Sequence, residues 1–248
     1  MPGRLPVKED FPPKLQVTII PPPGRDAPTN ILVLLHGLGD KKEAFERLGQ
    51  QMRLPETACV CIDGPNRLLD LVGYHWGDDI LFDSTTGGLD ADAGLKKTTE
   101  LLKQIVNDSL LGKCEYQLRD IVFLGYGQGG MASLSLALAI FLDASEARFG
   151  ELGGVISIGA PLPTEATASL INKCKTPILV CAGNDQTSVN PSAVDKLQRN
   201  FEYVEISRYR RPGDTMPANR DEMTPVMRFM SRRLLSQKGV LPGSIELS

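Results

Sequence analysis

One stretch decides the fold of this chain: IVFLGYGQGG, residues 121–130. Its first four residues are apolar, which is typical of a strand that is buried on both faces. A turn with glycines at Gly125 and Gly129 follows, and small residues then open a helix. This layout is that of a nucleophile elbow, in which the middle residue of Gly-x-x-x-Gly is a catalytic serine. Here the middle residue is Gly127, which has no side chain.

Apolar runs alternate with helical patterns on both sides of this stretch. Core strands are predicted at residues 31–35, 58–62, 155–158 and 177–181, with outer strands at 15–20 and 201–206. Helices are predicted before Pro55, over 95–110, from about Gly129 and over 222–235. This alternation favours an α/β fold, with a mostly parallel sheet and helices on both faces.

Composition narrows the class of protein. The 248 residues carry a net charge of −3, which argues against a broad nucleic-acid-binding surface. The five cysteines show no metal-binding spacing, so we expect reduced, buried thiols and no metal or cofactor. The longest apolar run, residues 134–142, is too short to span a membrane. The N-terminus lacks an apolar signal core, and a cytoplasmic location is the default expectation.

The chain is predicted to form one domain. Residues 1–14 are rich in proline and charge, and we expect a flexible N-terminal extension there. Residues 15–236 hold all the predicted strands and helices and form the expected single domain. Residues 237–248 are expected to form a loose C-terminal tail.

Three motifs resemble one known family. They are LHGLGD at residues 35–40, GYGQGG at 125–130 and LVCAG at 179–183. In order and spacing they are similar to the acyl-protein thioesterase and small carboxylesterase (phospholipase/carboxylesterase) family of α/β-hydrolases. The resemblance covers roughly residues 15–236. It implies an α/β-hydrolase fold, with a serine at the elbow, an acid after the late strand and a histidine before the last helix.

The chain departs from the family pattern at all three positions. Gly127 stands where the resemblance places the serine, and Gln186 stands where it places the acid. Asp185 is one residue away and becomes the acid if the loop shifts. The histidine position falls at about Asp214, and the second half of the chain contains no histidine. The catalytic triad is therefore predicted to be lost.

The backbone donors of the oxyanion hole do not depend on side chains. The resemblance assigns them to the amides of Leu38 and Gln128, which would bind an acyl carbonyl, a carboxylate or a phosphate. His75 and Trp76, in the long connection over residues 63–92, are further candidates for ligand contact. The alternative for both is that they pack this connection over the edge of the sheet.

Two functions follow from these residues. The favoured hypothesis is a catalytically silent hydrolase-like protein that binds a ligand or serves as an interaction scaffold for a protein partner. The alternative is an active carboxylesterase or thioesterase with a relocated constellation, in which His75 and the acids at Asp78 and Asp79 activate water.

Overall fold

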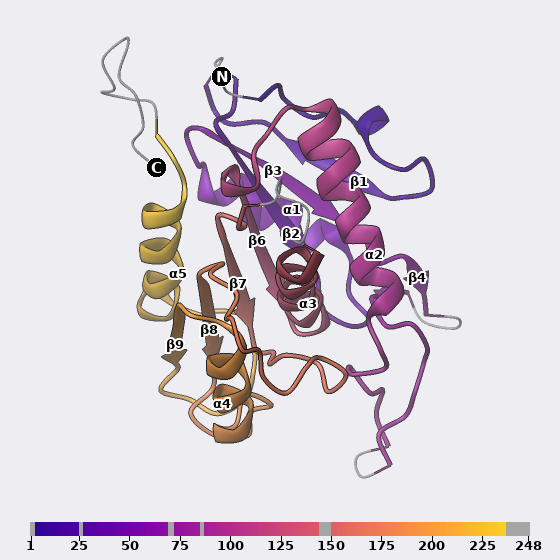
Figure 1. Ribbon diagram of the computed structural model, residues 1–248, viewed down its shortest axis with the longest axis vertical. Helices are drawn as coiled ribbons and strands as arrows, with labels where there is room; N and C mark the ends of the chain where they lie inside the picture. The colour runs from indigo at the N-terminus through magenta and orange to yellow at the C-terminus, as the bar shows by residue number, and fades with distance from the viewer. Residues whose placement is uncertain (1–2, 25–26, 69–71, 85–86, 144–149, 237–248) are drawn as a thin grey trace.

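The computed structural model describes residues 3–24, 27–68, 72–84, 87–143 and 150–236. Its centre is a seven-stranded sheet in the order β1-β3-β2-β6-β7-β8-β9 (Figure 1). The strands are β1 (Val17–Ile20), β2 (Asn30–Leu35), β3 (Thr57–Ile62), β6 (Ile121–Tyr126), β7 (Gly154–Ile158), β8 (Ile178–Ala182) and β9 (Val204–Arg208). β1 is antiparallel to β3, and every other pair in this sheet is parallel. The predicted mostly parallel sheet is confirmed.

Helices cover both faces of this sheet (Figure 1). They are α1 (Lys42–Met52), α2 (Lys96–Gln104), α3 (Gln128–Asp143), α4 (Pro191–Asn200) and α5 (Arg220–Arg233). The helix expected over 95–110 changes at its end into a π-helix, η2 (Ile105–Lys113). A small hairpin, β4 (Asn66–Arg67) with β5 (Tyr74–His75), lies outside the main sheet.

Alternating side chains of the strands build two cores. In β2, Ile31 and Val33 face a core that also receives side chains of α2, α3 and α4. Leu32 and Leu34 face a second core, which contains side chains of α1 and α5. All four side chains are fully buried, as expected for a strand covered on both faces. Six strands, β3, β2, β6, β7, β8 and β9, run in the same direction, so their carboxyl ends lie at one edge of the sheet.

The N-terminal segment corrects a prediction. Residues 1–14 were predicted to be a flexible extension, but within residues 3–14 the segment around Asp10 and Phe11 is buried, and Asp10 is hydrogen-bonded to η2. Phe11 is buried, and the Asp10 backbone carbonyl accepts hydrogen bonds from Ser109 Oγ and Lys113 Nζ, both at 2.8 Å. Arg4 forms a two-pronged ion pair with the Asp10 carboxylate. The predicted C-terminal tail, 237–248, lies outside the described residues.

The Asp10 ion pair predicts a dependence of stability on pH. The hydrogen bonds from Arg4 lower the pKa of Asp10 from 3.8 to about 2. Because the unfolded chain binds this proton more readily, the stability that Asp10 contributes is present above about pH 4 and is lost as the pH falls towards 2. The thermal midpoints of wild type and Asp10→Asn should therefore converge over that window. Glu9→Gln, which changes an exposed neighbour, is the control, and an equal convergence there would contradict the assignment.

Hydrogen bonds hold the long connection between β3 and α2 in place. The Asp78 carboxylate accepts hydrogen bonds from the amides of Lys96 and Lys97 at the start of α2. Asp92 accepts one from the amide of Thr164 at 2.7 Å. Carboxylates at a helix N-terminus satisfy its free amides and favour its dipole. The described part of this connection is thus held over the sheet by packing and hydrogen bonds.

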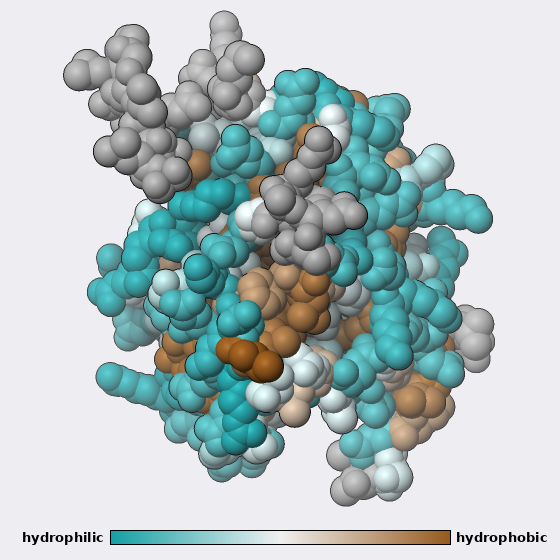
Figure 2. Space-filling model, in the orientation of Figure 1, coloured by the Kyte–Doolittle hydropathy of each residue, from teal (hydrophilic) through white to brown (hydrophobic). Residues whose placement is uncertain are grey.

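The surface of the molecule combines hydrophilic areas with a smaller apolar area (Figure 2). Among the described residues, no helix is both long and apolar enough to cross a membrane. Figure 2 shows a largely hydrophilic face on which apolar atoms gather near the middle, in the region where Figure 1 places α3. A cavity of about 290 Å³ lies between α2, α3 and the segment 163–167, and Leu138 and Leu142 line it.

Candidate active site

Gly127 lies at the tip of the elbow between β6 and α3. Its φ of +51° lies in the left-handed region, which glycine adopts without a steric penalty. Its amide donates to the Ile158 carbonyl at 2.9 Å, which ties the turn to the end of β7. A β-carbon at Gly127 would have the Cα of Gly37 as its nearest neighbour, at 3.8 Å. The turn therefore has space for a β-carbon at this position, although glycine carries none.

The flanking glycines are required by close packing. A β-carbon on Gly125 would lie 2.2 Å from the Gly129 carbonyl oxygen. One on Gly129 would lie 2.5 Å from the carbonyl oxygen of His36 and 2.6 Å from that of Leu35. Because these contacts are with backbone, side-chain rotation cannot relieve them. The elbow thus keeps the tight strand-turn-helix packing that positions its central residue.

His36, which follows β2, is bound on both ring nitrogens. Nδ1 lies 2.7 Å from the Gly37 carbonyl, and Nε2 accepts a hydrogen bond from the Gly64 amide at 2.8 Å. This arrangement places the proton on Nδ1 and leaves the ring neutral. Burial lowers the pKa of His36, although Asp63 lies 3.8 Å from Nε2. His36 therefore stabilises the loop and has no free nitrogen for catalysis.

A buried hydrogen bond joins Gln128 to Trp76 beside the elbow, and His75 directly precedes Trp76. Gln128 Oε1 accepts from the Trp76 amide at 2.7 Å, and its Nε2 donates to the Ala91 carbonyl at 2.9 Å. Trp76 is fully buried and its indole N–H donates to the His36 carbonyl. His75 is also buried, and this burial lowers the pKa of its imidazole. The two side chains expected to contact a ligand therefore pack the long connection against the elbow.

Asp214 lies in the loop after β9, where the histidine was expected. Its carboxylate joins this loop to the one after β8. Oδ1 accepts from the Gly183 amide at 3.1 Å and from Thr187 Oγ1 at 2.7 Å. Oδ2 accepts from the Ser188 amide at 2.7 Å and from its hydroxyl at 3.1 Å. The loop after β9, where the resemblance places a histidine, thus supplies a carboxylate. The donors to this carboxylate come from the loop after β8, where the resemblance places the acid.

The residues expected at the acid position lie away from this carboxylate. Gln186 is exposed and has a φ of +48°. Asp185 is exposed too, and its Oδ1 accepts a hydrogen bond from the Gln186 amide at 2.8 Å. Neither side chain is hydrogen-bonded to Asp214 in the part of the chain that the structure describes. The shifted-loop alternative, in which Asp185 would serve as the acid, stays a prediction.

Tyr126 connects three of the loops at this edge. Its hydroxyl donates to the Asp214 carbonyl at 3.1 Å, and its ring lies 2.8 Å from where a β-carbon of Gly37 would be. The sequence analysis did not single out Tyr126, Thr187 or Ser188. The only signal for the latter two was a hydroxyl pair shortly after Gly183.

Cysteine and acid side chains give no sign of a metal centre. All five cysteines are buried with free thiols, as expected for reduced core residues. Within the described ranges, no group of three or more histidine, cysteine, aspartate or glutamate side chains is placed to hold a metal ion.

Comparison with known proteins identifies the family. A family model described as phospholipase/carboxylesterase matches residues 18–231. The chain belongs to this family. Its curated relatives include an uncharacterized hydrolase of Schizosaccharomyces pombe, 25% identical over 233 residues that cover 91% of this chain and 92% of that one. Acyl-protein thioesterase 1 of Mycosarcoma maydis is 30% identical over 138 residues, covering 50% of this chain and 57% of the relative.

Solved structures confirm the fold of this phospholipase/carboxylesterase family member. Esterase PE8 superposes with a TM-score of 0.66 at 23% identity, covering 89% of this chain and 99% of the esterase. Acyl-protein thioesterase 2 of Zea mays gives a TM-score of 0.62 at 20% identity, with coverage of 88% and 98%. The α/β-hydrolase fold predicted from the sequence is therefore confirmed.

Proposed function

We propose that this member of the phospholipase/carboxylesterase family is catalytically silent and binds a ligand at the retained elbow without hydrolysing it. The observation that carries the proposal is the pair Gly127 and Asp214. A serine nucleophile needs a base within hydrogen-bond reach, and here a glycine faces a loop whose carboxylate is bound by four donors. The ring nitrogens of His36, one of only two histidines in the chain, are both occupied.

The backbone amides of Leu38 and Gln128 support the ligand-binding part. Within the described residues, neither amide donates to a protein acceptor. The Gln128 amide opens α3, where the helix dipole and free N–H groups favour an anion or a carbonyl oxygen. A β-carbon built at Gly127 would have no neighbour closer than 3.8 Å, so the tip of the elbow itself is not blocked. We therefore favour a carboxylate or an acyl carbonyl as the bound group.

A titration with octanoate, followed by ¹⁵N–¹H NMR, tests this binding. The amide resonances of Leu38 and Gln128 should shift saturably and more than those of residues remote from the elbow. The Glu9 amide serves as the remote reference, because the neighbouring Asp10 contacts Lys113 at the end of η2, ahead of the start of β6 and away from the elbow at its end. Saturable shifts that leave both elbow amides unmoved would contradict the assignment of the ligand to these donors.

An active carboxylesterase or thioesterase is the second candidate, and one observation favours it. Burial lowers the pKa of His75, which keeps its imidazole neutral and able to accept a proton near pH 7. The His75→Ala variant separates the two functions. If the protein is an active hydrolase, ester turnover should fall to background in this variant. If the protein is silent, wild type and variant should both show background turnover.

Gly127→Ser should leave ester hydrolysis at background. The added β-carbon meets no close neighbour, but no histidine lies in the loop after β9 to take the proton of the serine, and the Asp214 carboxylate is already bound by the neighbouring loop. The left-handed φ should cost about 1–2 kcal/mol of stability. Release of p-nitrophenol by this variant, compared with Gly127→Ala, is the measurement. Turnover only in the serine variant would show that a base operates at the site.

A further inference from the structure

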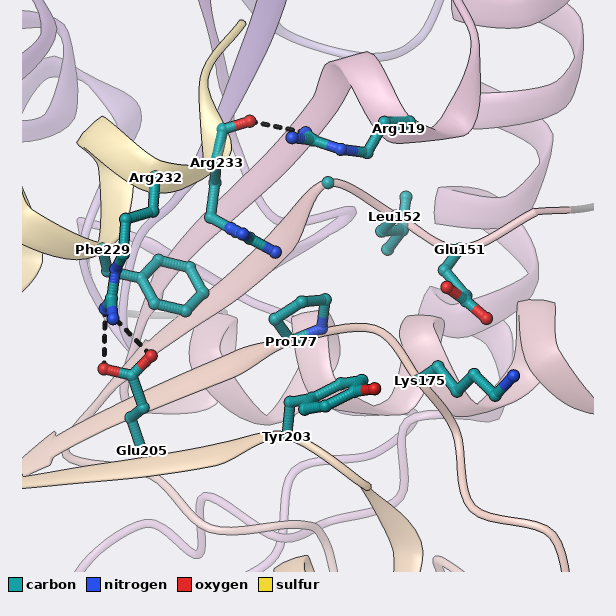
Figure 3. A pocket seen from close by; sticks show the side chains of 11 residues that line it. Arg119, Glu151, Leu152, Lys175, Pro177, Tyr203, Glu205, Phe229, Arg232 and Arg233 are labelled. Atoms are coloured by element: carbon teal, nitrogen blue, oxygen red, sulfur yellow. Dashed lines mark hydrogen bonds and ion pairs between the residues drawn. The ribbon is translucent and has the colours of Figure 1, made fainter. Parts of the chain in front are cut away.

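A cavity lies at the edge of the sheet where the parallel strands begin, whereas the elbow lies at the edge where they end. It has a volume of about 510 Å³ and is formed where β7, β8 and β9 begin, together with the end of α5 (Figure 3). Small-molecule sites commonly occupy about 300–1,000 Å³. The cavity shares no lining residue with the elbow, so whatever it binds is separate from the ligand proposed above.

The charged side chains of this cavity are predominantly basic. Its cations are Arg119, Lys175, Arg232 and Arg233, and its acids are Glu151 and Glu205. The lining therefore carries two more positive than negative charges, in a chain whose net charge is −3. A local excess of this sign concentrates anions near the cavity.

Only one of the three arginines has its charge compensated by a direct ion pair. Arg232 binds Glu205 through two contacts, at 2.7 and 2.9 Å, and is turned away from the cavity centre (Figure 3). Arg119 donates to the Arg233 carbonyl, which fixes its position without neutralising it. Within the described residues, Arg233 and Lys175 have neither a hydrogen bond nor an ion pair through their side chains.

The position of Arg233 is set by packing on the sheet. Its Cγ lies 3.3 Å from where a β-carbon of Gly154 would be, so its aliphatic part rests on the first residue of β7. Figure 3 shows its guanidinium group pointing into the cavity towards Pro177. Partial burial, together with repulsion by Arg119 and Arg232, lowers the pKa of Arg233. A bound anion would relieve this repulsion.

An aromatic ring flanks the basic group. Tyr203 lies on the cavity wall with its ring in view, and its side chain points towards Lys175 (Figure 3). The residue is 53% exposed, which leaves its ring available for stacking. Aromatic pairs add about 0.5–1.5 kcal/mol beyond the apolar area that they bury. The ligand that suits both features has an anionic head and an aromatic or apolar body.

We propose that this cavity binds a small phosphomonoester, with the phosphate dianion held by Arg233 and Arg119 and the organic group stacked on Tyr203. Two unbalanced positive charges match a dianion, and the planar guanidinium presents paired donors to phosphate oxygens. A monocarboxylate would leave one of these charges uncompensated.

Isothermal titration of the full chain with phenyl phosphate at low salt tests the proposal. Saturable binding is expected at pH 7.5, and it should weaken at pH 5.5 because the second phosphate ionisation lies near pH 6. Arg233→Gln and Arg119→Gln should each weaken binding about tenfold or more, as expected for losing a hydrogen bond to a charged group. Thermal unfolding of both variants checks that they remain folded.

Arg47→Gln is the matched control, because it removes the same charge from an exposed position on α1. Its affinity for phenyl phosphate should equal that of wild type. Inorganic phosphate should bind more weakly than phenyl phosphate, and benzoate more weakly still. Absence of saturable binding, equal weakening in Arg47→Gln, or benzoate binding as tight as phenyl phosphate would each overturn the proposal.

Discussion

Gly129→Ala is expected to cost about 3 kcal/mol of folding free energy, at the upper end of the range for overpacked cores. The added methyl group would lie 2.5 and 2.6 Å from the carbonyl oxygens of His36 and Leu35. Relief requires α3 to move away from the end of β2, which would separate the elbow from the loop that carries Leu38. Urea unfolding of the variant and of wild type measures the loss.

Gly127→Ala provides the control from within the same turn. Its methyl group would meet nothing closer than 3.8 Å, so only the left-handed φ of +51° opposes it. That conformation should cost about 1–2 kcal/mol. Equal losses in the two variants, or a Gly129→Ala protein as stable as wild type, would show that the elbow is looser than described.

Asp214→Ala is expected to lose about 2–3 kcal/mol of folding free energy. Four donors from the loop after β8 lose their acceptor, and the amide of Gly183 is left in a buried residue without its partner. An unsatisfied buried donor alone costs about 1–3 kcal/mol. Because part of the carboxylate environment is exposed, the sum of the separate bonds would overestimate the effect.

Asp185→Ala is the matched control for this aspartate. Its carboxylate lies in the same group of loops but accepts only from the amide of the next residue, Gln186. A change at such an exposed position should stay within about 0.5 kcal/mol. If Asp214→Ala unfolds at the same urea concentration as Asp185→Ala, the Asp214 carboxylate does not join the two loops in solution.

The core strands could be predicted from sequence because their signal is local. The apolar runs at 31–35 and 58–62 became β2 and β3 with shifts of one residue at most. α4 was not predicted, because its ten residues are mostly polar and only Leu197 is a buried apolar residue. The signal that was available is Asn190 followed by Pro191, a capping residue and a proline in the first turn.

Long-range contacts could not be read from the chain in the same way. Residues 3–14 looked like a flexible extension because their partners in η2 lie about a hundred positions away, as in the contact between Asp10 and Ser109. The partners of Asp214 are likewise set by which loops meet at the edge of the sheet. The glycine at position 127 and the lack of histidine after residue 75 could be read from the sequence directly, since they are properties of the sequence alone.

We propose that the protein keeps the backbone of the elbow but does not hydrolyse esters, and a measurement of ester turnover tests this most directly. Purified wild-type protein should release p-nitrophenol from short-chain p-nitrophenyl esters, and thiol from acyl thioesters, no faster than a blank without protein. Turnover by wild type that clearly exceeds this blank and is lost in His75→Ala would contradict the account and show an active hydrolase.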